Sequence, residues 1–239
     1  MNTKLPLWAD LPRIEKLREH FIVLRGFVHP DPVFETIESL IQISPWRNMR
    51  IASGALMSVQ MSNCGHLGWI SDHAGYQYCR TDPQTHNPWP DMPAQWLTLA
   101  DQAARVAGFA SFSPDACLMN RYQRGTRLGL HRDQDEADFS HPIVSISLGA
   151  SARFVLGGLH RQDPTQAVML NSGDVLVWGG PDRLVYHGVG VPRQSAHSTA
   201  QATDSADAAH AAQTVRINLT FRKAGRDEHQ AYNEQTRQK

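Results

Sequence analysis

Three residues of this sequence, His131, Asp133 and His187, combine residue types and spacing that suit a divalent iron ion. One residue separates His131 from Asp133, and His187 follows 54 residues after Asp133. Two imidazoles and one carboxylate can hold one face of Fe(II) and leave its other positions open, which is the facial triad of non-haem iron oxygenases. The pattern therefore indicates an oxygen-activating enzyme.

A His-x-Asp pair alone is weak evidence for a metal site, and the chain contains a second one. His29 and Asp31 have the same spacing, but Pro30 and Pro32 flank the aspartate. Proline restricts the residue before it and lacks an N–H donor, so this segment is typical of a turn. We predict Asp31 as the N-cap of a helix whose first residue is Pro32, and no metal ligand here.

Residues around His131 and His187 have the composition of β-strands. The runs are short, rich in Val, Ile, Leu or aromatic residues, and separated by Gly, Pro, Asn or Asp. Such strands can bring distant metal ligands together on a rigid scaffold. The predicted strands are Ala116–Tyr122, Leu128–Leu130, Ile143–Leu148, Arg153–Leu156, Ala167–Leu170, Asp174–Trp178, Arg183–His187 and Arg216–Arg222.

The last of these strands carries a row of polar residues. Side chains alternate along a strand, so Arg216, Asn218, Thr220 and Arg222 share one face. Arginine offers a rigid fork that matches a carboxylate, as a dicarboxylate co-substrate such as 2-oxoglutarate requires. Asn120 and Tyr122 share one face of their own strand and are aimed at the same ligand in this interpretation. The alternative is an ordinary polar face at a sheet edge.

Several motifs, in this order along the chain, resemble those of the AlkB family of DNA dealkylases. The similarity runs from about Phe27 to Arg222. It rests on the following segments: Met61–Trp69, Asp82–Thr85, Asn120–Tyr122, His131–Glu136, Pro142–Gly149, Gly173–Gly180, Tyr186–Gly188 and Arg216–Arg222.

The resemblance implies a mostly β, α+β protein with a double-stranded β-helix (jelly-roll) core. It implies oxidative demethylation of N-methylated bases, such as 1-methyladenine and 3-methylcytosine, with Fe(II), 2-oxoglutarate and O2, releasing formaldehyde, succinate and CO2. His131, Asp133 and His187 would bind iron. The residues matching 2-oxoglutarate contacts are Asn120, Tyr122, Arg216, Asn218 and Arg222, and those matching contacts to the flipped base are Trp69, Tyr76, Asp135 and Arg161.

The properties of such bases agree with several of these residues. A cationic methylated base would be attracted by Asp135, which could also accept a hydrogen bond from the exocyclic amine. The base must leave the stack to react, and Trp69, Tyr76 and His131 offer flat partners. We predict a glycine-rich loop over residues 65–75 that closes over the substrate. Arginines 121, 124, 127 and 132 surround the metal motif and could bind phosphates, although a solvated basic face is the simpler interpretation.

Length and composition indicate one domain with extensions. Of the 239 residues, we assign 1–26 to an N-terminal extension, 27–222 to the dioxygenase domain and 223–239 to a disordered tail. Substrate-recognition loops are expected at about 50–90, and a polar insertion at 194–210. Helices are predicted over 32–43 and 93–107, packed outside the strands. The three cysteines are too few for a disulfide framework, and no membrane span or secretory signal is visible, so we expect a cytoplasmic, monomeric protein.

Three alternatives remain beside DNA repair. The same chemistry could act on RNA, on a protein or on a small molecule. A non-catalytic module that binds damaged bases would predict a broken triad or missing arginines, and both are intact. A zinc or cupin-type protein would typically carry a His-x-His pair, which this sequence lacks.

Overall fold

A computed structural model describes residues 7–8, 12–192 and 215–225. Its centre is an eight-stranded sheet with the strand order β1-β2-β12-β9-β14-β7-β4-β3. The bounds of these strands are Arg13–Arg18 (β1), Phe21–Arg25 (β2), Val175–Trp178 (β12), Ile143–Gly149 (β9), Arg216–Arg222 (β14), Ala116–Tyr122 (β7), Leu56–Gly65 (β4) and Arg47–Arg50 (β3).

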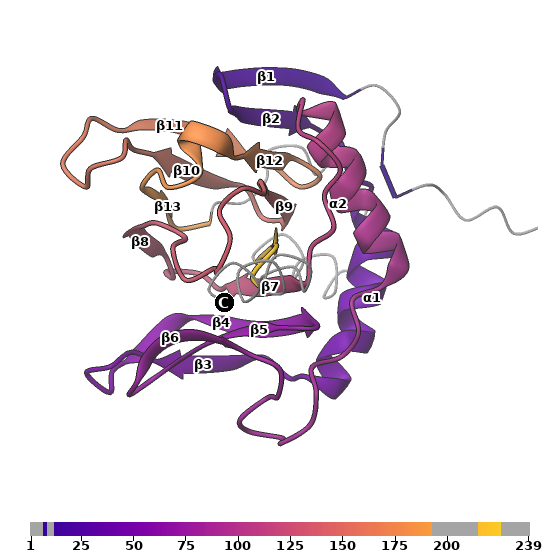
Figure 1. The fold of residues 1–239 in the computed structure, drawn as a ribbon, viewed down its shortest axis with the longest axis vertical. Helices are drawn as coiled ribbons and strands as arrows, with labels where there is room; N and C mark the ends of the chain where they lie inside the picture. Colours follow the sequence, from indigo (N-terminus) through magenta and orange to yellow (C-terminus); the bar gives the residue numbers. More distant parts are fainter. Residues whose placement is uncertain (1–6, 9–11, 193–214, 226–239) are drawn as a thin grey trace, which may run out of the picture.

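A four-stranded sheet, β11-β10-β13-β8, forms the second layer of the core. It contains Gln166–Leu170 (β11), Ala152–Leu156 (β10), His187–Val189 (β13) and Leu128–His131 (β8). Figure 1 shows it on the opposite side of the large sheet from the helices. Two sheets facing each other with antiparallel pairing form the expected jelly-roll core.

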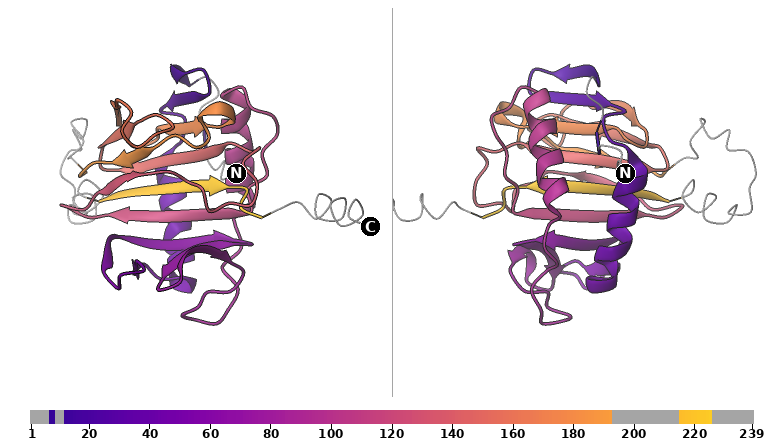
Figure 2. Two further views of the ribbon diagram at one scale, coloured as in Figure 1. Left: turned by 60° about the vertical axis from the view of Figure 1, so that its left-hand side comes forward. Right: turned by 90° about the vertical axis from the view of Figure 1, so that its right-hand side faces the viewer.

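Two helices cover the outer face of the large sheet, as predicted (Figure 2). They are α1 (Pro30–Ile43) and α2 (Ala94–Val106), and the short 3-10 helix η1 covers Gly180–Asp182. Along α2, Trp96, Leu99, Ala100, Ala103 and Ala104 are buried, because helical spacing places them on one stripe toward the sheet. None of the helices in the described part of the chain is long and apolar enough to cross a membrane.

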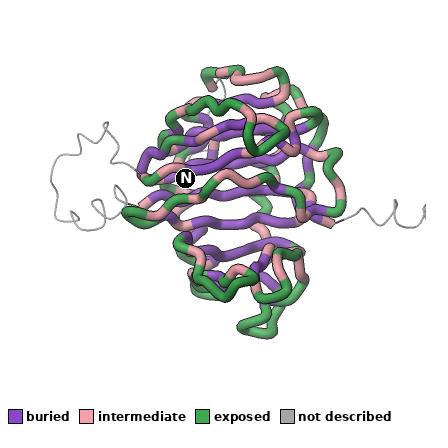
Figure 3. The backbone as a smooth tube through the Cα atoms, turned by 90° about the vertical axis from the view of Figure 1, so that its left-hand side faces the viewer, coloured by how far each residue is buried: buried purple, intermediate pink, exposed green. Residues whose placement is uncertain are grey.

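Alternation along the strands separates two cores. Ile217, Leu219 and Phe221 pack in the cluster beneath the helices. On the neighbouring strand β7, Leu118 and Tyr122 point to the other face of the large sheet and pack between the two sheets. Figure 3 shows buried residues along the strands and exposed residues in the connecting loops. The polar face of β14 therefore points into the space between the sheets.

Four local expectations were wrong. Helix α1 begins at Pro30 with His29 as its N-cap, so Asp31 is a first-turn residue, where its charge suits the helix dipole. Residues 183–186 of the predicted strand 183–187 form no strand: Arg183 and Val185 belong to turns after η1, and β13 begins only at His187. Residues 13–25, which we had placed outside the dioxygenase domain, form β1 and β2, because the apolar run Phe21–Leu24 pairs with β12 inside the sheet.

The fourth correction concerns residues 65–75. Gly68–Asp72 (β5) and Gly75–Cys79 (β6) form a hairpin, where we had predicted a loop. Gly75 permits its turn with a φ of 106°, and the Asn63 side chain bonds both the N–H and the C=O of Trp69, at 3.0 and 2.9 Å. The insertion at 194–210 and residues 226–239 of the tail lie outside the described residues.

Candidate metal centre

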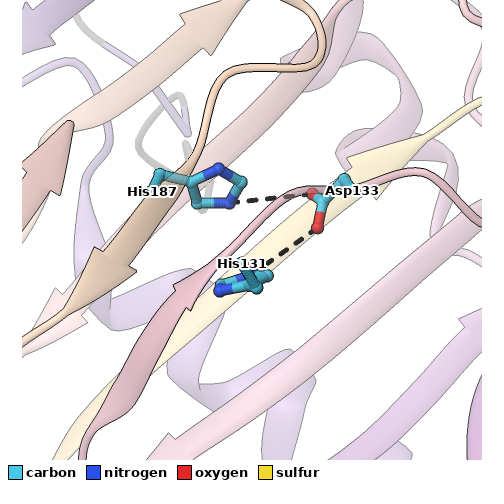
Figure 4. Close-up of side chains that lie close together, drawn as sticks. All are labelled: His131, Asp133 and His187. Carbon is cyan, nitrogen blue, oxygen red and sulfur yellow. Dashed lines mark ion pairs between the residues drawn. The ribbon is translucent and has the colours of Figure 1, made fainter. Parts of the chain in front are cut away.

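Adjacent strands of the four-stranded sheet bring the two histidines together. His131 is the last residue of β8, His187 is the first of β13, and the two are register partners. Their ring centroids lie 4.4 Å apart. Asp133 enters from the segment after β8, and Figure 4 shows its carboxylate beside the two imidazoles, with a dashed line to each.

The three side chains are close enough to share one ion. Asp133 Oδ1 lies 3.7 Å from His131 Nε2, and Asp133 Oδ2 lies 4.0 Å from His187 Nε2. One ligand atom from each residue falls within 4.8 Å of the others, and no other such cluster occurs among the described residues. Two nitrogens and one carboxylate oxygen form the donor set that suits Fe(II).

Backbone carbonyls orient both imidazoles for this role. His131 Nδ1 lies 2.9 Å from the Gly129 carbonyl, and His187 Nδ1 lies 3.1 Å from the Val185 carbonyl. An Nδ1–H that donates to a carbonyl leaves the Nε2 lone pair for a metal. Burial and the neighbouring His131 lower the pKa of His187 to about 4, so its ring is neutral near pH 7.

Arg222 orients Asp133. Its Nε and Nη2 donate to Oδ2, at 3.1 and 2.7 Å. Burial alone would raise the pKa of Asp133, but Arg222 and the two histidines hold it well below its ordinary value. The carboxylate is therefore ionised, with Oδ1 turned toward His131.

A second buried cation, Arg216, has N–H donors that the described residues leave without an acceptor. Its Nη2 donates to Ser147 Oγ at 2.9 Å, but Nε and Nη1 have no hydrogen-bond partner within the described part of the chain. The Oδ1 atom of Asn120, which is the register partner of Asn218, also has no hydrogen-bond partner among the described residues. Unsatisfied groups at this depth are costly unless a ligand completes them. Because β14 lies between β7 and β9, its polar face is not a sheet-edge face, and the arrangement suits a buried carboxylate.

One cavity of about 420 Å³ connects these groups. It is lined by the triad, by Asn120 and Tyr122 of β7, and by Arg216, Asn218, Thr220 and Arg222 of β14. Asn218 Nδ2 already donates to Ser145 Oγ and to the Ile146 carbonyl, at 2.7 and 3.0 Å, which fixes its amide. The polar residues that strand alternation predicted on one face of β14 therefore all line this cavity.

The hairpin β5–β6 supplies aromatic side chains to the same cavity. The Trp69 and Tyr76 rings stack with centroids 5.3 Å apart and an interplanar angle of 23°. Trp69 Nε1 donates to Asp135 Oδ2 at 2.8 Å. Tyr76 is 54% exposed, so one wall of the cavity is a flat aromatic surface open to solvent.

Basic residues at the cavity differ from the predicted cluster. Arg161 and Arg132 line the cavity, whereas Arg121, Arg124 and Arg127 do not. Arg161 Nη1 donates to the Leu130 carbonyl at 2.8 Å, and its guanidinium lies 5.9 Å from the centre of the Tyr186 ring.

The sequence interpretation assigned no role to three residues that tie the site together. Tyr78 donates to Glu136 Oε1 at 2.9 Å, and that oxygen lies 3.2 Å from Arg222 Nε. Arg183 Nη2 lies 3.2 Å from Glu136 Oε2. Tyr78 shares the parity of Tyr76 and could have been found from alternation, but nothing in the local sequence distinguishes Arg183.

Comparisons with known proteins agree with this geometry. The family model of the 2OG-Fe(II) oxygenase superfamily matches residues 20–222. The alpha-ketoglutarate-dependent dioxygenase AlkB of Escherichia coli (strain K12) is 44% identical over 227 residues, covering 94% of this chain and 100% of that protein. The AlkB homolog of Caulobacter vibrioides (strain NA1000 / CB15N) is 49% identical over 146 residues, covering 61% of this chain and 64% of that protein.

The solved structure of OsALKBH1 superimposes with a TM-score of 0.74 at 28% sequence identity. The match covers 88% of this chain and 100% of that chain. A match of this extent concerns the fold as a whole and not only the metal motif.

Proposed function

The chain belongs to the AlkB family of the 2OG-Fe(II) oxygenase superfamily and is an iron- and 2-oxoglutarate-dependent dioxygenase, and we propose that it repairs alkylated DNA by oxidative demethylation of N-methylated bases. The observation that carries the proposal is the single cavity. It joins the triad, a buried guanidinium with free donors and an aromatic wall beside a carboxylate.

When bound, iron with 2-oxoglutarate and O2 supplies the oxidation of the N-methyl carbon, after which formaldehyde, succinate and CO2 are released. His131, Asp133 and His187 would hold the iron. Arg216 would bind the far carboxylate of 2-oxoglutarate through Nε and Nη1, for which the described residues supply no acceptor. Asn120, Tyr122, Asn218 and Arg222 line the same part of the cavity and would complete the co-substrate site.

Trp69, Tyr76, Asp135 and Arg161 would hold the damaged base. The stacked pair offers a face for the ring, and each such stack contributes about 1–3 kcal/mol. Asp135 Oδ2 accepts from Trp69, so Oδ1 remains to accept from an exocyclic amine and to attract a cationic base. The base must be flipped out, or come from a single strand, to enter a cavity of this size.

The names of the relatives support a nucleic-acid substrate but do not distinguish DNA from RNA. Mouse ALKBH1 is called a nucleic acid dioxygenase, and an Arabidopsis thaliana relative a DNA N(6)-methyladenine demethylase. The test is turnover of matched DNA and RNA single strands, each with one 3-methylcytosine, followed by mass spectrometry, with Fe(II) or 2-oxoglutarate omitted as controls. Loss of the methyl group from DNA only in the complete mixture supports the proposal. Succinate formation without demethylation of DNA would refute the substrate and keep the oxygenase.

The variant Asp135→Asn tests whether Asp135 contacts the damaged base and not the co-substrate. This isosteric variant removes the charge and can still accept the Trp69 N–H. We expect a drop of about tenfold or more in demethylation rate with unchanged 2-oxoglutarate binding. An equal loss of both would make Asp135 a structural residue or a co-substrate contact.

A further inference from the structure

The hairpin β5–β6 is bonded to two consecutive acids of the segment that carries Asp133. Trp69 of β5 and Tyr78 of β6 are register partners in this hairpin. Trp69 Nε1 donates to Asp135 Oδ2 at 2.8 Å, and the Tyr78 hydroxyl donates to Glu136 Oε1 at 2.9 Å. Asp135 already has a role in binding the damaged base, whereas the bond from Tyr78 has no role in the proposed function.

Glu136 lies between the two arginines that hold the iron ligand Asp133. Arg183 Nη2 lies 3.2 Å from Glu136 Oε2, and Arg183 Nη1 donates to the backbone carbonyl of Asp133 at 3.0 Å. Arg222 donates to Asp133 Oδ2 from both Nε and Nη2, and its Nε also forms an ion pair with Glu136 Oε1. Because all four side chains are at most 8% exposed, the solvent screens these contacts weakly.

One nitrogen of Arg222 is shared by two carboxylates. Arg222 Nε lies 3.1 Å from Asp133 Oδ2 and 3.2 Å from Glu136 Oε1, so both oxygens compete for a single N–H. The Tyr78 hydroxyl donates to the same Oε1 atom, where it occupies a lone pair and weakens the attraction of that oxygen for Nε. Without this donor, Glu136 would draw Nε away from Asp133.

We propose that Tyr78 is a positioning residue for the iron site. By donating to Glu136 while the hairpin is docked, it keeps Arg222 Nε on Asp133 and so fixes the carboxylate that binds iron. A docked hairpin therefore gives a firmly held ligand, and an undocked hairpin gives a loosely held one. The iron centre belongs to the family, and only the purpose of this coupling, which is oxidation when a base is enclosed, rests on the proposed function.

The first test needs neither co-substrate nor nucleic acid. Its probe is Co(II), which binds the same donor types as Fe(II) and has visible absorption bands that report the geometry of its ligands. Tyr78→Phe removes only the hydroxyl. The Kd for Co(II) should rise about fivefold, less than the effect of a group that bonds a ligand directly, because Tyr78 acts through Glu136. The absorption bands should shift as well.

The matched control is Ser71→Ala, which removes another hydrogen bond of the same hairpin. Ser71 Oγ donates to the Arg50 carbonyl at 2.7 Å, which ties β5 to β3. This variant should bind Co(II) with the Kd and the absorption bands of the wild type. Wild-type values in Tyr78→Phe would overturn the proposal. Equal changes in both variants would also overturn it, because they would show a general loosening of the hairpin.

The second test measures how much succinate forms for each methyl group removed from a 3-methylcytosine oligonucleotide. A loosely held ligand favours oxidation of 2-oxoglutarate without the base, so this ratio should rise about threefold or more in Tyr78→Phe. It should keep its wild-type value in Ser71→Ala. An unchanged ratio in Tyr78→Phe would contradict the proposal. If the wild type forms succinate but removes no methyl group, the proposed function fails, and the Co(II) measurement alone decides the role of Tyr78.

Discussion

At the scale of single residues, the two carboxylate oxygens of Asp133 have different neighbours. Arg222 donates twice to Oδ2, while Oδ1 faces His131. The spacing His131-x-Asp133 predicted the ligands, because a strand end followed by a turn brings both to one point. It did not predict Arg222 as the group that orients the carboxylate, because that contact joins residues 89 positions apart.

Arg216 provides a direct test of the co-substrate site. Arg216→Lys keeps the charge but removes the planar fork, so the KM for 2-oxoglutarate should rise about tenfold to a hundredfold, with iron binding unchanged. Succinate formation against co-substrate concentration measures the change. Arg153→Gln serves as the control that should leave KM at the wild-type value, because this exposed arginine of β10 lies on the face opposite the cavity-lining Phe154. An unchanged KM in Arg216→Lys would move the far carboxylate to another residue.

Tyr122 should make the fold sensitive to alkali. Burial raises the pKa of Tyr122 from its ordinary 10.0 to about 12. A pKa raised by folding gives a stability that is present below pH 10 and is lost as the pH rises through about 12. At pH 11 this loss should be about 1.4 kcal/mol. Urea unfolding at pH 9 and pH 11 measures it, and Tyr122→Phe should lose less stability than the wild type over this interval. Equal losses in both proteins would show that Tyr122 ionises normally.

At the scale of elements, the sequence did not predict the hairpin β5–β6. Glycines 65, 68 and 75 favoured a loop, yet Gly68 and Gly75 each have a separate structural role in the hairpin. Gly75 permits the hairpin turn, and Gly68 faces the Trp89 indole, which is held by its bond to the Cys79 carbonyl at 2.9 Å. The strands were hidden because the glycines serve packing and turn geometry, which depend on residues remote in the sequence.

Gly68→Ala tests this packing role. Its Cβ would overlap the Trp89 indole, and overpacking of this kind costs about 1–3 kcal/mol of unfolding free energy. The displaced hairpin should also weaken oligonucleotide binding. Gly129→Ala is the matched control, because a Cβ there meets nothing within 4 Å and Gly129 does not have a positive φ. Equal stability of the two variants would contradict the packing that we describe.

At the scale of the whole molecule, much of the fold followed from the sequence. Strand alternation predicted the polar face of Arg216–Arg222, and helical periodicity predicted two helices that pack outside the strands. The contribution of residues 13–25 to the large sheet did not follow, because strand pairing depends on a partner, β12, more than 100 residues away. The site was predictable where one strand supplied several groups and unpredictable where Tyr78, Glu136 and Arg183 converge from separate segments.

Glu136 should contribute strongly to the free energy of unfolding of the molecule. It lies between Arg183 and Arg222, accepts from Tyr78 of the hairpin, and is 6% exposed. Glu136→Ala leaves two buried guanidinium groups short of a partner and should cost about 3–5 kcal/mol. Tyr78→Phe removes one hydrogen bond and should cost about 1 kcal/mol. Urea unfolding of both variants checks the difference, and a loss in Glu136→Ala no larger than in Tyr78→Phe would show that the network is not coupled.

The central claim is that His131, Asp133 and His187 form the iron centre of a base demethylase. Its most direct test is demethylation of a 3-methylcytosine oligonucleotide, followed by mass spectrometry, for the alanine variant of each residue. The control is His141→Ala, because His141 lies beside Asp138 outside the triad. We predict that all three triad variants lose turnover and that His141→Ala retains it. Full activity in any one of the triad variants would contradict the account.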